Sequence, residues 1–79
     1  MRKTFKTSGV CTQAIEIEVE DEIVKDVRFL GGCHGNTQGI SKLVTGMKVS
    51  DVIARLEGIT CGNRSTSCPD QLAKALKAF

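Results

Sequence analysis

Residues 15–20 show a strict alternation of apolar and acidic side chains, and the apolar Ala14 precedes it. An isoleucine or valine stands at every second position, and a glutamate follows each one. This period of two is typical of a β-strand with one face buried and the other in water. The sequence therefore predicts a strand over residues 14–20, with an apolar face formed by Ile15, Ile17 and Val19.

A second strand is predicted over residues 23–30, running back along the first. Asp21 and Glu22 suit a tight turn between the two, and Lys25 interrupts the apolar face of the returning strand. A shorter edge strand is expected over residues 3–8. The residues of the return strand that we expect to face inward are Ile23, Val27 and Phe29.

After residue 36 the apolar period lengthens to that of a helix. One helix is predicted from residue 36 or 37 to Gly46, and a second from a Ser50 cap to Glu57. A third begins near residues 67–69 and runs to the C-terminus, with Pro69 in its first turn. The predicted buried stripes are Ile40, Leu43, Val44 and Met47, then Val52, Ile53 and Leu56, then Leu72, Ala73, Leu76 and Phe79.

Strands followed by helices predict an α+β domain. We expect an N-terminal antiparallel sheet of about three strands and about three helices packed on one of its faces. No repeat or linker divides the chain, so residues 1–79 form one domain. A domain of this size buries only about 60% of the surface of its unfolded chain. Such domains often depend on a metal ion, a disulfide or a partner subunit for stability.

The N-terminus carries no apolar run of the secretory kind, and no segment reaches the roughly 18 apolar residues of a membrane span. We therefore expect a cytoplasmic protein without a membrane segment, in a compartment where thiols stay reduced. The chain nevertheless has four cysteines. In a reducing compartment they indicate metal binding or redox chemistry before structural disulfides.

The charge pattern argues against a nucleic-acid partner. The net charge is +2, from 11 basic and 9 acidic residues spread along the chain. Arg2, Lys3 and Lys6 form a short basic cluster at the N-terminus rather than the stripe that nucleic-acid binding proteins present. Three phenylalanines and no tryptophan or tyrosine do not supply aromatic platforms for bases.

All four cysteines fall at the ends of predicted elements, outside the buried stripes. Cys11 lies between two strands, and Cys33 lies in the glycine-rich loop between a strand and a helix. Cys61 lies in the loop between the second and third helices, and Cys68 begins the third. A helix N-terminus carries partial positive charge, which stabilises a thiolate. We therefore predict that the four converge on one metal ion.

Zinc is the predicted metal, because four thiolates suit tetrahedral Zn²⁺ in a closed structural site. The same donors accept iron or an iron–sulfur cluster. His34, beside Cys33, is a reserve ligand that would replace one sulfur. Buried inert thiols and redox-active pairs remain open alternatives, because no pair has the Cys-x-x-Cys spacing of common zinc sites.

Other chemistry has weak support in the sequence. The glycine-rich segment 31–39 precedes a helix, as phosphate loops do, but it lacks the Gly-Lys-Ser/Thr ending. A single histidine gives no Ser/His/Asp constellation. We therefore predict no catalytic residue and no nucleotide cofactor.

Residues 66–70 read Thr-Ser-Cys-Pro-Asp, the motif after which the TSCPD family is named. Upstream, the segments 31–36 (Gly-Gly-Cys-His-Gly-Asn), Gly46-Met47 and Cys61-Gly62 stand as in that family. The chain resembles a stand-alone member over essentially its whole length. In the family, the domain occurs alone in bacterial proteins or at the C-terminal end of adenosylcobalamin-dependent ribonucleotide reductases.

This resemblance implies a cysteine-rich, zinc-binding accessory module with Cys11, Cys33, Cys61 and Cys68 as ligands and a protein partner, with a ribonucleotide reductase the first to consider. It does not imply reductase catalysis, which needs a much larger barrel. The order of elements is also similar to iron–sulfur cluster assembly scaffolds, whose three cysteines would match positions 33, 61 and 68. The chain departs from that pattern by its fourth cysteine and by lacking a histidine directly before Cys68.

Overall fold

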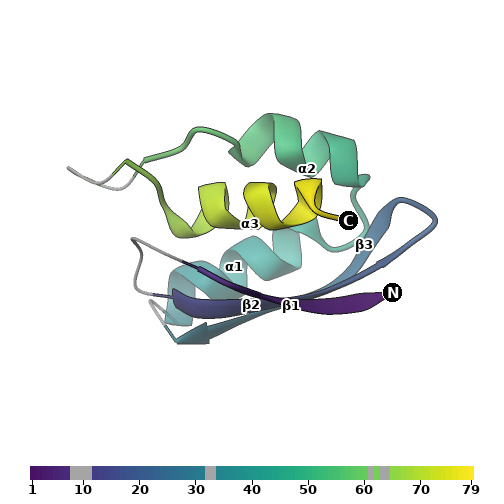
Figure 1. The fold of residues 1–79 in the computed structure, drawn as a ribbon, viewed down its shortest axis with the longest axis horizontal. Helices are drawn as coiled ribbons and strands as arrows, with labels where there is room; N and C mark the ends of the chain where they lie inside the picture. Colours follow the sequence, from purple (N-terminus) through teal and green to yellow (C-terminus); the bar gives the residue numbers. More distant parts are fainter. Residues whose placement is uncertain (8–11, 32–33, 61, 63–64) are drawn as a thin grey trace.

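The computed structural model describes residues 1–7, 12–31, 34–60, 62 and 65–79, without the side chains of residues 34–36. Three strands come first and three helices follow, as predicted. Figure 1 shows the helices on one side of the sheet, so the α+β prediction is confirmed. The elements are β1 (Arg2–Lys6), β2 (Thr12–Glu20), β3 (Ile23–Gly31), α1 (His34–Val44), α2 (Val49–Leu56) and α3 (Cys68–Lys77).

The sheet has the order β1-β2-β3 with antiparallel neighbours. The alternation in β2 places Ile15 and Ile17 in the core, each 0% exposed. Asp21 and Glu22 form the turn to β3, both with positive φ of 52° and 65°. This backbone twist matches the twist of the two strands that the turn joins.

The inward face of β3 differs from the prediction near the turn. Asp26 pairs with Glu18, but Val24 already pairs with Val19, so one extra residue lies in β3 at this point. This bulge makes Val24 (0% exposed) the core residue where the sequence predicted Ile23, which is half-buried. Lys25, the residue that interrupted the apolar pattern, is the extra residue and is exposed.

The buried face of α1 is rotated about the helix axis relative to the predicted one. Val44 is buried and Ile40 half-buried, but Leu43 is 77% exposed, so its predicted burial is wrong. Thr37 takes a buried position on this face at 4% exposure. The helix packs with one narrow side along β3, which leaves the Leu43 side of the helix in water.

The second helix begins two positions earlier than predicted. Its N-cap is Lys48, which makes no side-chain capping bond, so Ser50 is not the cap. Val52 is fully buried, and Ile53 and Leu56 pack against the core as expected. Gly46 and Gly58, both with positive φ, follow the ends of α1 and α2, as predicted.

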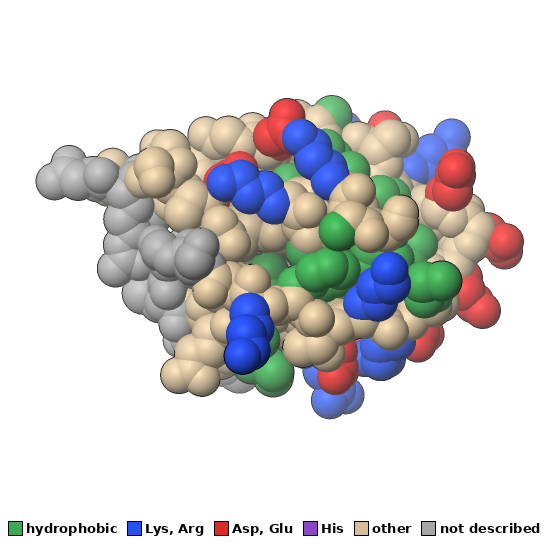
Figure 2. Space-filling view, viewed as in Figure 1, with side chains coloured by type: hydrophobic (Ala, Val, Ile, Leu, Met, Phe, Trp, Pro, Cys, Tyr) green, Lys and Arg blue, Asp and Glu red, His purple; other side chains and the backbone are tan. Residues whose placement is uncertain are grey.

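The third helix follows the prediction closely. Ser67 is its N-cap, Pro69 lies in its first turn, and Leu72, Ala73 and Leu76 are at most 2% exposed. α3 packs between the sheet and α2 and closes the core. Where this core reaches the surface, Figure 2 shows hydrophobic side chains gathered on one face among charged ones. A shallow hollow there is lined mainly by Met1, Val19, Val49, Ile53, Leu76 and Phe79.

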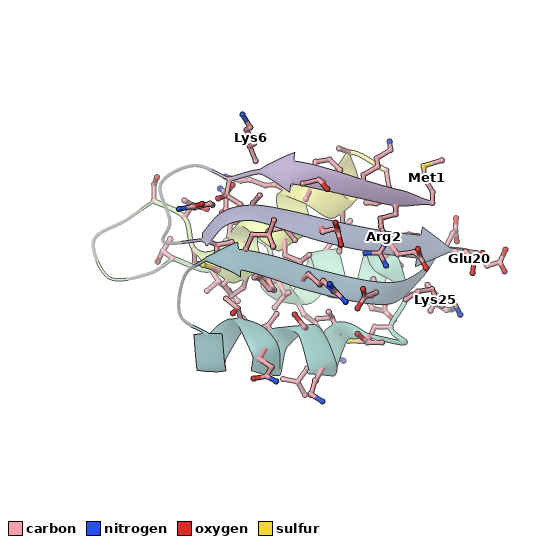
Figure 3. All side chains as sticks on the ribbon, turned by 90° about the horizontal axis from the view of Figure 1, so that it is seen from below. Met1, Arg2, Lys6, Glu20 and Lys25 are labelled. Atoms are coloured by element: carbon pink, nitrogen blue, oxygen red, sulfur yellow. The ribbon has the colours of Figure 1, made fainter. Side chains whose placement is uncertain are left out.

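The opposite face of the sheet is charged, and in the described part of the chain no helix covers it (Figure 3). Arg2 reaches across all three strands and contacts Glu16 at 2.6 Å and Asp26 at 3.1 Å. It also contacts Glu18 at 3.3 Å. The side chain of Arg2 is therefore committed to these internal ion pairs. Among the described residues, no helix is long and apolar enough to cross a membrane.

Candidate metal centre

Of the four predicted ligands, the structure describes Cys68. Cys11, Cys33 and Cys61 lie outside the described residues, as does the side chain of the reserve ligand His34. Within the described part of the chain, no three His, Cys, Asp or Glu side chains are grouped to hold a metal. The shared site stays a prediction, but the surroundings of Cys68 and the described neighbours of the other cysteines bear on it.

Cys68 is the first residue of α3 and contacts the start of β2. Its Sγ lies 3.0 Å from the Oγ1 of Thr12, which is 56 positions away in the sequence and 1% exposed. The thiol itself is free and half-buried. Either atom can be the donor, and a Cys68 thiolate would accept from the Thr12 hydroxyl. Hydrogen bonds of this kind orient and stabilise sulfur ligands in metal sites.

Thr12 also joins this place to the end of β3. It pairs with Gly31, the last residue of that strand. In the sequence, Thr12 directly follows Cys11, and Gly31 stands two positions before Cys33. Figure 1 shows the start of β2, the end of β3 and the starts of α1 and α3 at the same end of the molecule. The chain therefore brings Cys68 and the described neighbours of two other cysteines together.

Hydrogen bonds fix both ends of the segment that contains Cys11. The backbone N–H of Thr7 donates to the carbonyl of Gln13 at 3.2 Å, which continues the β1–β2 pairing past the strand ends. The Thr7 hydroxyl donates to the carbonyl of Thr12. Thr7 and Thr12, the described residues on either side of Cys11, are thus held together beside Cys68.

Hydrogen bonds also join described residues on the two sides of Cys61. The Ser67 hydroxyl donates to the carbonyl of Ile59 at 2.7 Å. The same oxygen accepts a hydrogen bond from the backbone N–H of Asp70 at 3.1 Å. Ser67, the residue before Cys68, therefore caps α3 and also binds Ile59, which precedes Cys61 in the sequence.

Asp70 is the centre of this hydrogen-bond network, and it is 3% exposed. Its carboxylate accepts from the Thr66 hydroxyl at 2.5 Å and from the backbone N–H of Gly58 at 2.8 Å. Lys74, one turn along α3, pairs with it at 3.3 Å. A buried carboxylate needs such partners. Gly58 lies at the end of α2, so Asp70 connects the two helices directly.

The same contacts lower the pKa of Asp70. The hydrogen bond from Thr66 is the largest cause, and the backbone N–H of Gly58 is the next. Burial acts in the opposite direction, and Lys74 adds a smaller lowering of the pKa. Hydrogen bonds to the charged form favour that form, so Asp70 is held as a carboxylate.

Sequence reasoning missed the part played by Thr66 and Asp70. The signal was present, because Ser67 and Asp70 have the Ser-x-x-Asp spacing of a helix capping box. The burial of Asp70 and its bond to Gly58 were not visible there, since they depend on where α2 ends. The polar residues of the motif thus fix the helix start from which Cys68 projects.

The fold and this network define a small α+β domain in which a cysteine at a helix N-terminus is positioned by buried polar contacts. The model of the TSCPD domain family matches residues 1–79. The chain belongs to this family, as its sequence motifs indicated. No protein of curated function and no solved structure matched the chain in the corresponding comparisons.

Proposed function

We propose that the protein is a metal-binding accessory module, in which Cys11, Cys33, Cys61 and Cys68 hold one zinc ion. The observation that carries the proposal is that Thr12 pairs with Gly31 of β3 and also contacts the Cys68 sulfur at one end of the sheet. Consecutive Cα atoms are about 3.8 Å apart. Cys11, one residue from Thr12, and Cys33, two residues from Gly31, are therefore proposed to reach an ion bound by Cys68. Cys61 joins the proposed set on the sequence prediction.

The donor set fits such an ion. Four sulfurs satisfy tetrahedral Zn²⁺ and leave no position for a reacting water, which makes the proposed role structural. Thr12 would donate its hydroxyl to the Cys68 sulfur and reduce the charge on it. Metal binding then adds to folding energy, which a domain with such a small core needs.

The first test is elemental analysis of the purified protein together with single Cys→Ser variants. We expect about one zinc per chain in the wild type and loss of zinc in each of the four variants. His34→Asn should keep the metal. If His34→Asn loses the zinc and one cysteine variant keeps it, then the His34 imidazole, and not that cysteine, is the fourth ligand.

A matched variant separates metal loss from simple destabilisation. Ser67→Ala removes the cap of α3 but keeps all four sulfurs, so it should lower the melting temperature and retain the zinc. Cys68→Ser should lower the melting temperature and lose the zinc. Equal melting temperatures for wild type and Cys68→Ser, with and without chelator, would contradict a structural metal.

The alternative is an iron–sulfur carrier or a thiol relay, and the same preparation distinguishes them. A brown protein that contains iron and acid-labile sulfide would indicate a cluster. A colourless, metal-free protein that forms a disulfide between Cys61 and Cys68 on mild oxidation would indicate a relay. Either result would replace the zinc proposal.

We also propose a protein partner, with a ribonucleotide reductase subunit as the first to test. The chain matches the TSCPD family over residues 1–79, and the reductase is proposed on the resemblance alone, which implies that such domains also occur attached to these reductases. Sedimentation of the module with a purified reductase should give a complex that the zinc-depleted module does not form. If the zinc-bound module and the reductase sediment separately, the reductase is not the partner.

A further inference from the structure

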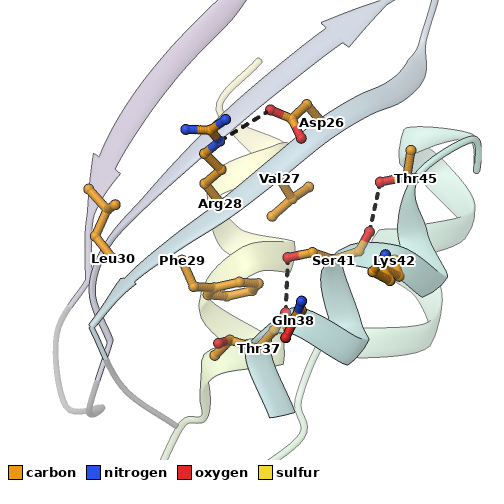
Figure 4. Close-up of a pocket in the computed structure, with 10 residues that line it drawn as sticks. All are labelled: Asp26, Val27, Arg28, Phe29, Leu30, Thr37, Gln38, Ser41, Lys42 and Thr45. Carbon is orange, nitrogen blue, oxygen red and sulfur yellow. Dashed lines mark hydrogen bonds and ion pairs between the residues drawn. The ribbon is translucent and has the colours of Figure 1, made fainter. Parts of the chain in front are cut away.

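A groove runs between the outer edge of β3 and one side of α1 (Figure 4). The strand contributes five consecutive residues to it, Asp26 to Leu30. Because neighbouring side chains of a strand point to opposite faces, a groove that touches all five follows the edge of the strand. From α1 the lining residues are Thr37, Gln38, Ser41, Lys42 and Thr45.

The pairing pattern shows which backbone groups of β3 face this groove. Val19 exchanges hydrogen bonds with Met1, and Gln13 accepts one from Thr7, so the odd residues of β2 bond toward β1. The even residues of β2 therefore bond toward β3. Val27 and Phe29 lie opposite odd residues of β2, so their N–H and C=O groups point away from the sheet.

The chain itself already uses the first part of this edge. Val24 donates its N–H to the carbonyl of Met47 at 2.9 Å and accepts from Gly46 at 2.8 Å. Ile23 forms a bridge with Lys48 in the same short stretch. Among the described residues, no segment continues this pairing past the bulge to Val27 and Phe29. Val27 is 4% exposed and Phe29 half-buried, so this edge is unpaired rather than open, and a strand that pairs with it must displace the α1 side chains lining the groove.

The charges along the groove favour an acidic occupant. Asp26 is already engaged by Arg2 at 3.1 Å and by Arg28 at 3.8 Å. The side chain of Arg28 is 71% exposed, and Lys42 is exposed and has no ion pair with a described residue. The lining of the groove therefore has one more positive than negative charge, since Asp26 is opposed by Arg28 and Lys42. Leu30, 47% exposed, adds an apolar contact at one end.

We propose that the groove between β3 and α1 binds an extended, acidic segment of a partner protein, which adds to the sheet as a fourth strand beside Val27 and Phe29. Backbone hydrogen bonds would supply affinity, and Arg28 and Lys42 would select for acidic side chains. This inference does not depend on a bound metal, because every residue that carries it belongs to β3, α1 or the sheet.

The probe is a fluorescein-labelled hexapeptide of alternating valine and glutamate, with a matched peptide of valine and lysine, measured by fluorescence anisotropy. We expect the acidic peptide to bind at least about tenfold more tightly, with a preference that weakens as salt is added. Equal binding of the two peptides, or no binding of either at millimolar concentration, would overturn the proposal.

Two N-methylated acidic peptides test strand addition directly. Methyl groups on one alternate set of nitrogens block the edge that pairs with β3, and those on the other set face water. One peptide should lose binding and the other keep it. In the complex, the amide protons of Val27 and Phe29 should exchange with solvent at least about tenfold more slowly. Equal effects of both methylation patterns would contradict a fourth strand.

Protein variants locate the charge selection. The double change Arg28→Glu and Lys42→Glu should weaken binding of the acidic peptide about tenfold, as expected for two exposed charge pairs. Arg55→Glu, an exposed basic residue of α2 outside the groove, is the control and should bind like the wild type. Amide shifts that map to β1 or to the apolar hollow at Phe79 would overturn the proposal. Self-association that protects Val27 without peptide would show a second copy to be the occupant.

Discussion

The second and third helices place an aspartate at the same position and use it in opposite ways. Asp51 and Asp70 are each the third residue of their helix. Asp51 is exposed, and its helix has no side-chain cap. Asp70 is buried and accepts hydrogen bonds from Thr66 and from the end of α2. The same residue type is thus a surface charge in one helix and a structural anchor in the other.

The difference follows from what each helix start must do. α2 needs only to place Val52 and its neighbours in the core, which its apolar side achieves. α3 must also anchor Gly58 and Ile59, which follow α2, and place Cys68 beside Thr12. Buried polar contacts are suited to this because they have narrow geometry, whereas apolar contacts tolerate small displacements.

The largest expected effect comes from Asp70→Ala. The change leaves the N–H of Gly58 and the hydroxyl of Thr66 without their acceptor in a buried place, which should cost about 3 kcal/mol of unfolding free energy. Urea unfolding followed by circular dichroism measures it. The control is Asp51→Ala, which should cost less than about 0.5 kcal/mol. If Asp70→Ala and Asp51→Ala lower the unfolding free energy by similar amounts, the buried hydrogen bonds of Asp70 do not stabilise the fold.

Acid should remove part of the same stabilisation. The pKa of Asp70 is lowered in the folded protein, so the unfolded chain binds this proton more readily. The stability that Asp70 provides is therefore complete above about pH 4, the ordinary aspartate range. It is lost as the pH falls through the lowered value in the folded state. Unfolding free energies measured at a series of pH values should fall less steeply in acid for Asp70→Asn than for wild type. Parallel profiles would refute the assignment.

A cap added to α2 should make the two helix starts more alike. Lys48→Asp places an acceptor at an N-cap that lacks one, beside the partial positive charge of the helix. We expect a gain of about 1 kcal/mol, measured by the same urea titration. No gain would mean that the backbone at Lys48, which pairs with Ile23, does not let the side chain reach the helix N–H groups.

The smallest expected effect is that of Ser50→Ala. Ser50 is exposed and lies inside α2 rather than at its cap. Alanine favours helix slightly more than serine does, so the stability should change by less than about 0.5 kcal/mol. A loss near 1 kcal/mol would restore Ser50 as the cap and shorten the helix in solution.

Much of the fold was predictable because it follows from local pattern. The alternation around Ile15 and Ile17 specifies a half-buried strand wherever it occurs, and Ser67 with Pro69 specifies a helix start. The errors at Ile23 and Leu43 have a different origin. A bulge at Lys25 and the narrow contact of α1 with β3 are set by the neighbouring elements, and the period of a single segment does not contain them.

The candidate site divides in the same way. By itself, the sequence predicted that the cysteines lie outside the apolar stripes, because Ile, Val, Leu and Phe occupy the positions that build the core. The structure bears this out at Cys68, the first residue of α3. Only the tertiary structure decided that Thr12 meets Cys68 and that Asp70 binds the end of α2. The Thr12–Cys68 pair is 56 positions apart, and the contact exists because the sheet and α3 bury their apolar faces against each other. Hydrophobic burial brings the two chain segments together, and the hydrogen bonds then fix their alignment.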